Sequence, residues 1–312
     1  MSSCLVIGAN GFIGSHLVDA LVLRGHTVTA FDRFSSGAPT YSAEGVRMVV
    51  GDFLNFADLS NALDDQELVF HFLSTTSPAT SDDEPILDLR TNVTYSVDFF
   101  RLCVEKAVGR VYFASTGGAI YGDQGLAQYQ ETDRCLPVSP YAIGKLTLEH
   151  YLRYFRNKHG LESVSLRISN PYGPRQHPHR RQGFIPIALR HIADHEPVGR
   201  FGDGSMIRDY IYVEDAAHMI ARIAGTVPAF PLYNIGSGVG HSVNEVLAVL
   251  GDVTELEFSV EDLSTPPTYV KKVVLDTSRY ENEFGPSTFR PLVEGVRATW
   301  DAFKSSPRGS QH

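Results

Sequence analysis

Residues 4–32, CLVIGANGFIGSHLVDALVLRGHTVTAFD, decide the fold. The apolar runs Cys4–Ile7 and Thr27–Phe31 are short enough for buried strands, and Ile13–Leu23 between them carries apolar residues at helical spacing. The stretch Gly8–Gly14, at the junction of the first strand and the helix, has the spacing Gly-x-x-Gly-x-x-Gly. A strand, a turn, a helix and a second strand in this order predict a βαβ unit with a glycine-rich first turn.

The glycine turn predicts a binding site for a nicotinamide dinucleotide. Glycine permits a tight turn and lets backbone N–H groups approach a pyrophosphate at the positive end of the helix. Asp32 ends the second strand about 20 residues further on, where a carboxylate can accept hydrogen bonds from an adenosine ribose and would repel a 2′-phosphate. NAD is therefore expected, with some room left for NADP by Arg33. The alternative is an ordinary βα turn, because this glycine spacing departs from Gly-x-Gly-x-x-Gly.

Short apolar runs alternate with segments of helical period through the rest of the first half. The further strands expected are Arg47–Val50, Leu68–Leu73, Val111–Ala114 and Val164–Ile168, and the further helices are Phe56–Leu63, Asn92–Ala107 and Tyr141–Asn157. Strands that alternate with helices imply a parallel sheet with helices on both faces. We therefore expect the α/β class, with a Rossmann-type doubly wound parallel sheet, for residues 1–167.

The sequence changes in character after Ile168, where prolines and glycines crowd among basic residues. We expect residues 168–312 to form a smaller C-terminal substrate-binding lobe. Two apolar runs in this half, Tyr210–Val213 and Tyr233–Ile235, still have the composition of strands. The chain is therefore expected to return to the first domain around residues 206–236.

Composition and charge disfavour several classes of protein. The 312 residues carry 27 Lys+Arg against 36 Asp+Glu, and the net charge of −9 disfavours general binding to nucleic acid or to an anionic membrane. We expect neither a secretory signal nor a membrane-spanning helix from these residues. The three cysteines are far apart, which fits a reducing cytoplasm. The basic stretch His177–Arg181 lacks carboxylates and thiols, so no metal is expected there.

Tyr141 and Lys145 stand four residues apart, so their side chains lie on one face of the expected helix. The pKa of a phenol is near 10 in model peptides, which is too high for a base at neutral pH. A neighbouring ammonium and a cationic nicotinamide ring favour the phenolate, which can take a proton from an alcohol while NAD takes a hydride. Taken alone, a Tyr-x-x-x-Lys pair is common on helices and is usually solvated.

Several motifs follow one another along the chain: Gly8–Gly14, Asp32, Gly51-Asp52, His71–Ser74, Ser115–Gly122, Tyr141 with Lys145, Leu166–Pro174 and Gly202–Ile211. In this order they resemble the extended short-chain dehydrogenases/reductases, specifically the NAD-dependent epimerase/dehydratase group. The resemblance covers nearly the whole chain and is greatest to UDP-glucose 4-epimerases. Its specificity comes from the ordered set of motifs.

The resemblance implies a role for each matching residue. Tyr141 would be the base, and Lys145 would orient the nicotinamide ribose. The residues implied to bind the cofactor, these two included, are Gly8, Asn10, Gly11, Phe12, Ile13, Gly14, Asp32, Arg33, Ser36, Gly37, Asp52, Phe53, Leu73, Ser74, Thr75, Asn92, Ser115, Tyr141 and Lys145. The residues implied to bind a nucleotide-sugar substrate are Asn170, Phe184, Arg200, Phe201 and Arg208.

The resemblance also implies a partner for Arg208 and an assembly of two chains. The guanidinium of Arg208 suits a diphosphate, but it can equally form a structural ion pair with Asp209 or Asp215. The resemblance also implies a homodimer that pairs the helices 92–107 and 141–157 of two copies.

Three departures from the family pattern bear on activity. The position that usually offers a serine or threonine hydroxyl to the substrate is Gly117, so the adjacent Thr116 is expected to take over this catalytic role. A position that is a bulky tyrosine in glucose-restricted epimerases is Val273, which would leave room for a 2-acetamido group. Pro266 and Tyr269 stand where the family often holds the nucleotide with Arg and Asp, which leaves the nucleobase open.

The residues beside the catalytic pair favour one reaction of the group. Gly118 and Ala119 stand where the resembling dehydratases place Asp-Glu, so the acid needed to expel a C6 hydroxyl is missing. Epimerisation at C4 needs no further acid, because the keto sugar rotates and receives the hydride on its other face. The expected function is a nucleotide-sugar 4-epimerase for UDP-hexoses or UDP-N-acetylhexosamines with tightly bound NAD. The alternatives are a reductase or dehydratase of the same group and a catalytically silent NAD-binding protein.

Overall fold

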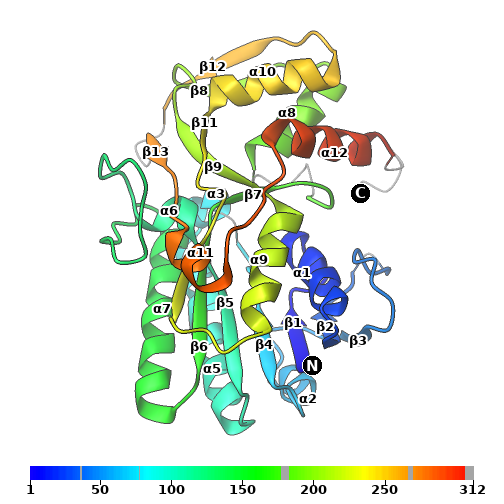
Figure 1. The fold of residues 1–312 in the computed structure, drawn as a ribbon, viewed down its shortest axis with the longest axis vertical. Coiled ribbons are helices and arrows are strands. Elements are labelled where there is room, and N and C mark those ends of the chain that lie inside the picture. Colours follow the sequence, from blue (N-terminus) through cyan, green and yellow to red (C-terminus); the bar gives the residue numbers. More distant parts are fainter. Residues whose placement is uncertain (36, 77, 177–182, 266–269, 306–312) are drawn as a thin grey trace.

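Seven parallel strands form the central sheet, in the order β10-β6-β5-β4-β1-β2-β3 (Figure 1). The computed structural model describes residues 1–35, 37–76, 78–176, 183–265 and 270–305. The strands of the large sheet are β1 (Ser3–Ile7), β2 (Thr27–Asp32), β3 (Arg47–Val50), β4 (Leu68–His71), β5 (Arg110–Thr116), β6 (Ser163–Ile168) and β10 (Leu232–Ile235). The strand order reverses between β1 and β4, which places a ligand crevice at their carboxyl ends. This confirms the predicted doubly wound sheet.

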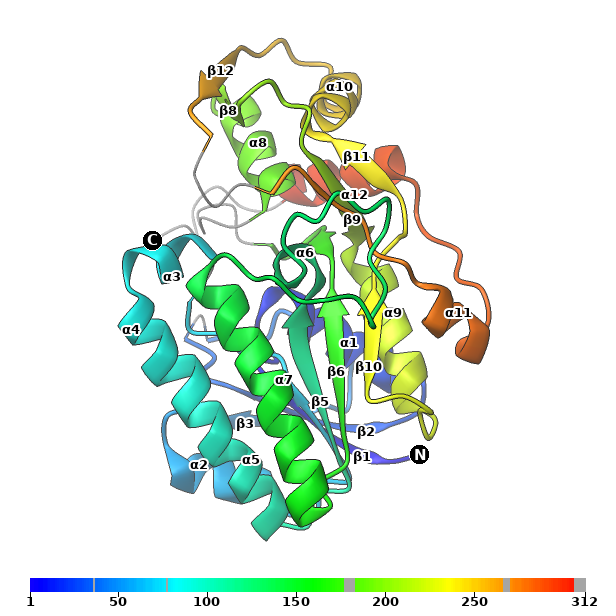
Figure 2. The same ribbon diagram turned by 90° about the vertical axis from the view of Figure 1, so that its left-hand side faces the viewer.

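Helices cover both faces of this sheet. Figure 2 shows the face that α5 and α7 cover. The helices that cover the sheet are α1 (Phe12–Leu23) and α9 (Val213–Ala224) on one face, and α2 (Phe56–Ala62), α5 (Tyr95–Glu105) and α7 (Pro140–His159) on the other. Strand β1 explains the two-sided cover, because Cys4 and Val6 enter the core under α1 and α9, whereas Leu5 and Ile7 enter the core under α5 and α7. All four are fully buried, so an unbroken apolar strand is required.

The segment before α5 differs from the single predicted helix Asn92–Ala107. It contains α3 (Pro78–Asp83), α4 (Pro85–Asp88) and a π-helix, η1 (Leu89–Thr94), which runs directly into α5. Pro85 starts α4 because proline fits the first helical turn. A π-helix is rare and frequently occurs at a functional site.

The remaining elements form a smaller lobe above the sheet in Figure 1. These elements are α8 (Phe184–Ala193), β8 (Val198–Phe201), β9 (Ile207–Tyr212), β11 (Gly240–Ser242), α10 (Val243–Thr254), β12 (Val260–Leu263), β13 (Lys272–Val273) and α12 (Leu292–Ser305). Strand β7 (Asn170–Tyr172) and helices α6 (Gly117–Ile120) and α11 (Ser278–Phe284) connect them to the sheet. Buried residues of α8, α10 and α12 form the core of this lobe.

Residues 206–236, where the chain was expected to return to the first domain, contribute strands to two different sheets. Strand β10 pairs with β6 in the large sheet, and α9 packs on α1. Strand β9 instead pairs with β7, β11 and β13 in a separate four-stranded sheet. An apolar run predicts a strand but not its sheet, and both edges of β9 are occupied by the lobe's own strands.

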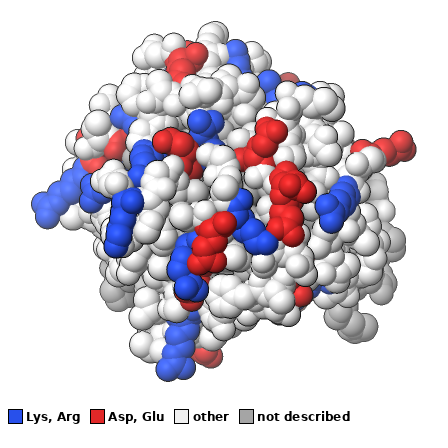
Figure 3. Space-filling model, turned by 90° about the horizontal axis from the view of Figure 1, so that it is seen from below, with Lys and Arg blue, Asp and Glu red and all other residues white. Residues whose placement is uncertain are grey.

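The surface at the end opposite the lobe carries both signs of charge. Figure 3 shows lysine and arginine beside aspartate and glutamate over this face. Within the described ranges, no helix combines the length and the apolar character needed to cross a membrane.

Candidate active site

The glycine-rich turn joins β1 to α1 at the carboxyl end of the sheet (Figure 1). Gly8 has φ +84°, and a Cβ at this position would lie 2.9 Å from the main-chain nitrogen of Leu73. Both the backbone conformation and the approach of the chain after β4 therefore require glycine. Gly11 is the N-cap of α1 and provides no side-chain cap, and the first turn of α1 holds no acidic residue. The N–H groups of this turn are thus positioned to bind an anion such as a pyrophosphate.

Asp32 lies at the end of β2, beside the glycine turn. Its Oδ2 accepts a hydrogen bond from the N–H of Asn10 at 3.0 Å, and its Oδ1 accepts one from the N–H of Arg33 at 2.7 Å. Asn10 is held in turn by the N–H of Thr40, which donates to Asn10 Oδ1 at 2.7 Å. These contacts fix the carboxylate where a ribose contact would need it.

The segment after β3 also lies beside Asp32, because the N–H of Gly51 donates to the Asp32 carbonyl at 3.0 Å. Asp52 follows directly. Phe53 is 2% exposed and stacks on His71, with ring centroids 4.9 Å apart. The ring of Phe53, one of the predicted cofactor residues, therefore packs in the core against Phe99 of α5.

The other predicted cofactor residues of the first βαβ unit fall into two groups. Phe12 and Ile13 form the first turn of α1 and are partly buried. Arg33 and Gly37 are exposed beyond β2. Ser36 lies outside the described residues.

Tyr141 and Lys145 lie one turn apart on α7. Ser139 caps this helix, and its hydroxyl oxygen accepts a hydrogen bond from the N–H of Ala142 at 3.3 Å. Lys145 Nζ donates to the carbonyl oxygen of Ala114 at 2.8 Å and lies 5.6 Å from the centroid of the Tyr141 ring. The two side chains therefore meet the same space at the end of β5, as predicted from their spacing.

Burial disfavours the charged form of both groups. It raises the pKa of Tyr141 to about 12, and the charge of Asp88 adds to this effect. It lowers the pKa of Lys145 to about 8, and here the charge of Asp88 acts in the opposite direction. Tyr141 is therefore a neutral phenol at pH 7 in the protein alone. To act as a base it needs a further positive charge nearby, such as an oxidised nicotinamide ring.

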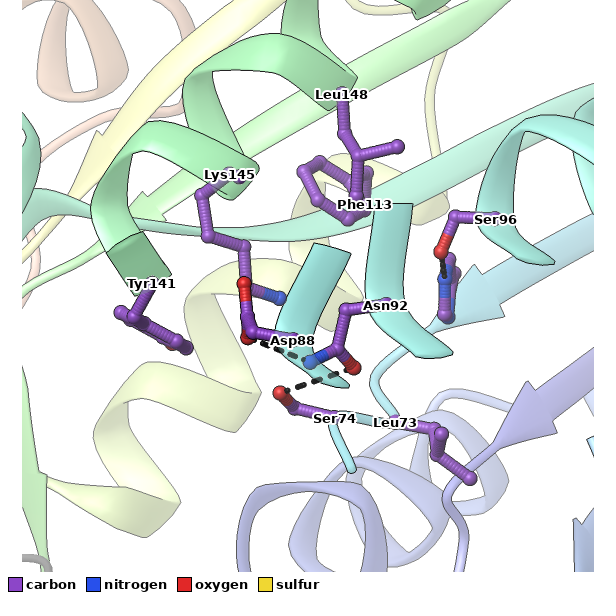
Figure 4. A pocket seen from close by; sticks show the side chains of 11 residues that line it. Leu73, Ser74, Asp88, Asn92, Ser96, Phe113, Tyr141, Lys145 and Leu148 are labelled. Carbon is purple, nitrogen blue, oxygen red and sulfur yellow. Dashed lines mark hydrogen bonds between the residues drawn. The ribbon is translucent and has the colours of Figure 1, made fainter. Parts of the chain in front are cut away.

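A small cavity of about 10 Å³ lies beside this pair (Figure 4). It brings together five residues of the prediction, namely Leu73, Ser74, Asn92, Tyr141 and Lys145. The other residues that line it are His71, Asp88, Ser96, Phe113, Gly144 and Leu148. Asp88 is the one ionisable group among them that sequence reasoning missed entirely. Its spacing of four residues before Asn92, one helical turn, is the signal that could have found it.

Asn92 is held by a network of hydrogen bonds on both sides of its amide group. Its Nδ2 donates to Asp88 Oδ1 and to Thr76 Oγ1, each at 2.8 Å. Its Oδ1 accepts a hydrogen bond from the N–H of Thr75 at 2.9 Å. The Ser74 hydroxyl donates to the carbonyl of Thr76 at 2.8 Å. The loop after β4 and the π-helix are thus locked together beside Tyr141.

His71 lies in the same cavity but does not supply an acid or a base. Its Nε2 is 2.7 Å from the hydroxyl oxygen of Ser96, and the ring is completely buried. Burial, with a smaller effect of the Lys145 charge, lowers the pKa of His71 to about 3. The imidazole is therefore neutral and packs among the aromatic residues below the site.

Two of the predicted residues, Ser115 and Thr116, stand at the end of β5, directly before Gly117. The hydroxyl of Ser115 donates to Glu149 Oε1 at 2.6 Å. Thr116 is the N-cap of α6 and is buried next to Gly117. A Cβ at Gly117 would lie 2.5 Å from Leu275 Cδ1 and 2.9 Å from the carbonyl oxygen of Arg167. Packing against Leu275 thus explains why this position is glycine.

We expect Gly117→Ser to destabilise the protein without raising its turnover. The added side chain would overlap Leu275, and overpacking of this kind lowers the free energy of unfolding by about 1–3 kcal/mol. Urea denaturation of the wild type and the variant measures the effect. The Gly117→Ser, Leu275→Ala double variant is the control. Because alanine at 275 leaves room for the serine, the double variant should lose less free energy of unfolding than the sum of the two single variants. An unchanged unfolding midpoint for Gly117→Ser would contradict the packing argument.

Asn170 and Arg208 lie on the paired strands β7 and β9. Asn170 Nδ2 donates to the carbonyl of Asp209 at 3.1 Å. Arg208 donates to the main-chain carbonyl oxygens of Ile207 at 2.8 Å and Val270 at 2.6 Å. The carboxylate of Asp209 instead accepts hydrogen bonds from Ser237 and from backbone N–H groups, so the expected alternative of an ion pair with Asp209 is wrong.

The other alternative for Arg208, an ion pair with Asp215, also fails. Asp215 Oδ2 accepts a hydrogen bond from the backbone N–H of Arg290 at 2.7 Å. The Asp215 carboxylate thus fastens the start of α12 to α9. The carbonyl contacts of Arg208 fasten β9 to the segment that leads into β13.

The remaining predicted substrate residues lie in the lobe. Phe184 starts α8, and Phe201 is exposed at the end of β8. Arg200 pairs with Asp262 of β12 at 2.7 Å and donates to Asn244 Oδ1 at 2.9 Å. These three predicted residues therefore sit on the lobe that faces the sheet, separate from the catalytic pair (Figure 2).

Some predictions fall on residues that the structure leaves undescribed. Pro266, Tyr269 and the basic stretch His177–Arg181 lie outside the described residues. Among those described, no three His, Cys, Asp or Glu side chains gather in a way that could hold a metal ion.

Comparison with known proteins places these features in one family. Residues 4–236 match the NAD dependent epimerase/dehydratase family. A UDP-glucose 4-epimerase of Mycolicibacterium smegmatis is 33% identical, over 96% of this chain and 98% of the relative. The crystal structure of a Thermus thermophilus UDP-glucose 4-epimerase in complex with NAD is similar with a TM-score of 0.89 and 32% identity, covering 98% of this chain and 100% of that one.

A further solved structure is a UDP-N-acetylglucosamine 4-epimerase from Methanobrevibacter ruminantium. It has a TM-score of 0.88 and 30% identity, and the match covers 97% of this chain and 98% of that one.

The residues of this chain fit the cofactor that the family uses, since the uncapped first turn of α1 suits a pyrophosphate and Asp32 suits a ribose. The chain therefore belongs to the NAD-dependent epimerase/dehydratase family, and its cofactor is NAD.

Proposed function

We propose that the protein is a nucleotide-sugar 4-epimerase that acts on UDP-hexoses or UDP-N-acetylhexosamines through a transient 4-keto sugar. One observation carries this proposal: Tyr141 and Lys145 converge at the end of β5, while the facing turn Gly117–Ile120 offers no acid or base. A Cβ at Gly118 would lie 3.1 Å from Asn170 Oδ1, so a larger side chain there would press on Asn170. Dehydration needs such a side chain, whereas epimerisation does not.

In this proposal each catalytic residue has one task. NAD, which the glycine turn Gly8–Gly14 and Asp32 would hold, would supply a reversible hydride acceptor for C4 of the sugar. Tyr141 takes the proton of the 4-hydroxyl and gives it back to the keto oxygen. Lys145 holds the nicotinamide ribose and favours the phenolate through its charge. Thr116, beside Gly117, offers its hydroxyl to the substrate.

The substrate side of the proposal rests on the lobe and on the solved relatives. Asn170 and Arg208 would face the diphosphate, and Phe184, Arg200 and Phe201 would hold the nucleoside. Relatives of about equal similarity act on UDP-glucose and on UDP-N-acetylglucosamine, as their names state. Val273 is small and buried, which favours acceptance of the 2-acetamido group.

A panel of UDP-, dTDP- and GDP-sugars tests the function. The purified protein is incubated with each sugar without added cofactor, and the configuration at C4 is followed by proton NMR. We expect UDP-glucose and UDP-N-acetylglucosamine both to equilibrate with their C4 epimers, with no net change in absorbance at 340 nm. Stoichiometric oxidation of NADH in a parallel incubation with added NADH would support a reductase. Loss of water from the sugar would support a dehydratase, and turnover of no sugar would support a silent NAD-binding protein.

We further propose a homodimer. Large apolar side chains lie exposed along one side of α7, where Ile143 is 51%, Tyr151 is 39% and Tyr154 is 46% exposed. Figure 2 shows α7 on the outside of the sheet. Leu87 of α4 and Leu89 of η1 are also exposed, and both elements contact α7. A stripe of this kind is more typical of an interface than of a solvated helix face.

We expect the Tyr151→Glu, Tyr154→Glu double variant to be monomeric, because two carboxylates would be buried in the interface. Sedimentation velocity of the wild type and variant measures the assembly. Val227→Glu is the matched control, since Val227 is an exposed apolar residue on the loop between α9 and β10, outside α5 and α7, and this variant should stay dimeric. A wild-type protein that sediments as a monomer would refute the dimer.

We propose the cytoplasm as the compartment. Cys4, Cys103 and Cys135 are all free thiols, and the first two are buried. This pattern is typical of a protein that works under reducing conditions. Fractionation of cells that produce the protein tests the location.

A further inference from the structure

Asp88 is a buried carboxylate at the centre of the site, and nothing in the family pattern described above gives it a role. It is the last residue of α4 and the residue from which the π-helix η1 starts. Asp88 is only 3% exposed. An ionised group buried this deeply is unfavourable unless its neighbours compensate it, so its presence beside Tyr141 needs a physical reason.

One oxygen of Asp88 holds the loop and the π-helix together. Oδ1 accepts hydrogen bonds from Asn92 Nδ2 at 2.8 Å and from the hydroxyl of Thr76. Asn92 in turn holds the N–H of Thr75, which extends the network into the loop after β4. This half of the carboxylate positions residues that line the cofactor site.

The other oxygen faces the catalytic helix. A Cβ at Gly144 would lie 3.2 Å from Asp88 Oδ2, so α7 approaches the carboxylate at the residue between Tyr141 and Lys145. Figure 4 shows Asp88 with Tyr141 and Lys145 on one side and Asn92 on the other. Glycine at position 144 permits this approach.

The charged and titratable groups that face Lys145 come from three elements. Tyr141 precedes it on α7, His71 lies on β4 and Asp88 lies at the end of α4. On the β5 side the ammonium lies 4.8 Å from the centroid of the Phe113 ring. Because His71 is neutral and Tyr141 is a neutral phenol, Asp88 is the anionic group of this set.

We propose that Asp88 is a positioning residue whose negative charge keeps Lys145 protonated inside the site while its hydrogen bonds fix Asn92. The proposal rests on the proposed function in that Tyr141 and Lys145 are taken as the catalytic pair. The charges of Asp88 and Lys145 cancel, so the interior beside Tyr141 holds no net charge before the cationic nicotinamide ring enters. Without Asp88, two positive charges would meet there, and Lys145 would lose its proton instead.

The titration of Lys145 can be observed directly, because the chain contains only six lysines. The protein is produced in medium that contains [¹³Cε]lysine and is studied as purified. The Lys145 signal is assigned by its absence in Lys145→Arg. We expect burial to hold the pKa of Lys145 in the wild type below the usual range of a lysine. In Asp88→Asn, which keeps the shape of the side chain and loses its charge, the midpoint should fall by about one pH unit.

Two controls separate charge from packing. Thr76→Val removes one hydrogen bond to Asp88 but keeps the charge, so it should leave the Lys145 midpoint in place. Asp98→Asn removes an exposed carboxylate of α5 and should do the same. If Asp88→Asn fails to fold, Asp88→Glu provides the test, since it keeps the charge and should keep the midpoint.

An unchanged Lys145 midpoint in folded Asp88→Asn, or a shifted one in folded Asp88→Glu, would overturn the proposal. This readout needs no substrate. A protein that epimerises sugars but shows no shift therefore rejects the role of Asp88 alone. A protein that shows the shift but turns over no sugar rejects the proposed function alone.

Discussion

Tyr141→Phe is expected to lose at least about 10²–10⁴-fold of the turnover while it keeps NAD, because proton transfer by a positioned base contributes an effect of this size. The phenol hydroxyl is the one group on α7 that can take the proton of the 4-hydroxyl in the proposed mechanism. The ring itself packs near Lys145, with its centroid 5.6 Å from Nζ, and phenylalanine preserves this packing. The rate is measured on the best sugar of the panel, and bound NAD is measured after denaturation of the protein.

Tyr151→Phe is the matched control for this variant. It removes only the hydroxyl of a tyrosine of the same helix that lies outside the cavity, and it keeps the apolar ring that the proposed interface would bury, so it should leave the rate within a factor of about two. A Tyr141→Phe variant that turns over sugar at a near-normal rate would refute the assigned base. Loss of NAD in the same variant would show that the tyrosine is needed for binding rather than for chemistry.

The first βαβ unit could be predicted from the sequence because each of its signals is local. Apolar runs of strand length, a helical period and a glycine turn are all contained in residues 4–32, and the structure confirms their order. The spacing of Tyr141 and Lys145 is local in the same way. A helix is enough to bring them together.

The features that sequence reasoning missed depend on contacts between distant segments. Arg208 has a side chain that suits a phosphate or a carboxylate, but only the pairing of β9 with β13 shows that main-chain carbonyls receive its hydrogen bonds. Phe53 follows a strand that ends at the cofactor site, yet its ring turns into the core against His71. The spacing of Asp88 and Asn92 could link these two residues to each other, but Asp88 lies beside Tyr141 only because α4, a π-helix and α7 pack together.

Breaking the buried ion pair behind the active site should have the largest effect on stability. Arg167 Nη2 lies 2.7 Å from Glu149 Oε2, and the two side chains are only 5% and 9% exposed. The guanidinium also donates to the hydroxyl of Tyr121 at 3.0 Å, and the carboxylate accepts a hydrogen bond from Ser115 at 2.6 Å. Removing either partner leaves the other charge buried and unpaired. We expect Arg167→Met and Glu149→Leu each to lower the free energy of unfolding by about 3–5 kcal/mol.

The double variant distinguishes an unpaired charge from lost packing. Arg167→Met with Glu149→Leu leaves neither charge in the interior, so it should be more stable than the sum of the single effects predicts. Lys106→Met is the control for an exposed pair, because Lys106 and Asp64 are 27% and 57% exposed, and its loss should be below about 1 kcal/mol. Additive losses in the Arg167 and Glu149 double variant would contradict the argument. Glu149 lies one turn after Lys145 on α7, so coupling between Glu149 and Arg167 would also mean that a buried charge pair anchors the catalytic helix to β6.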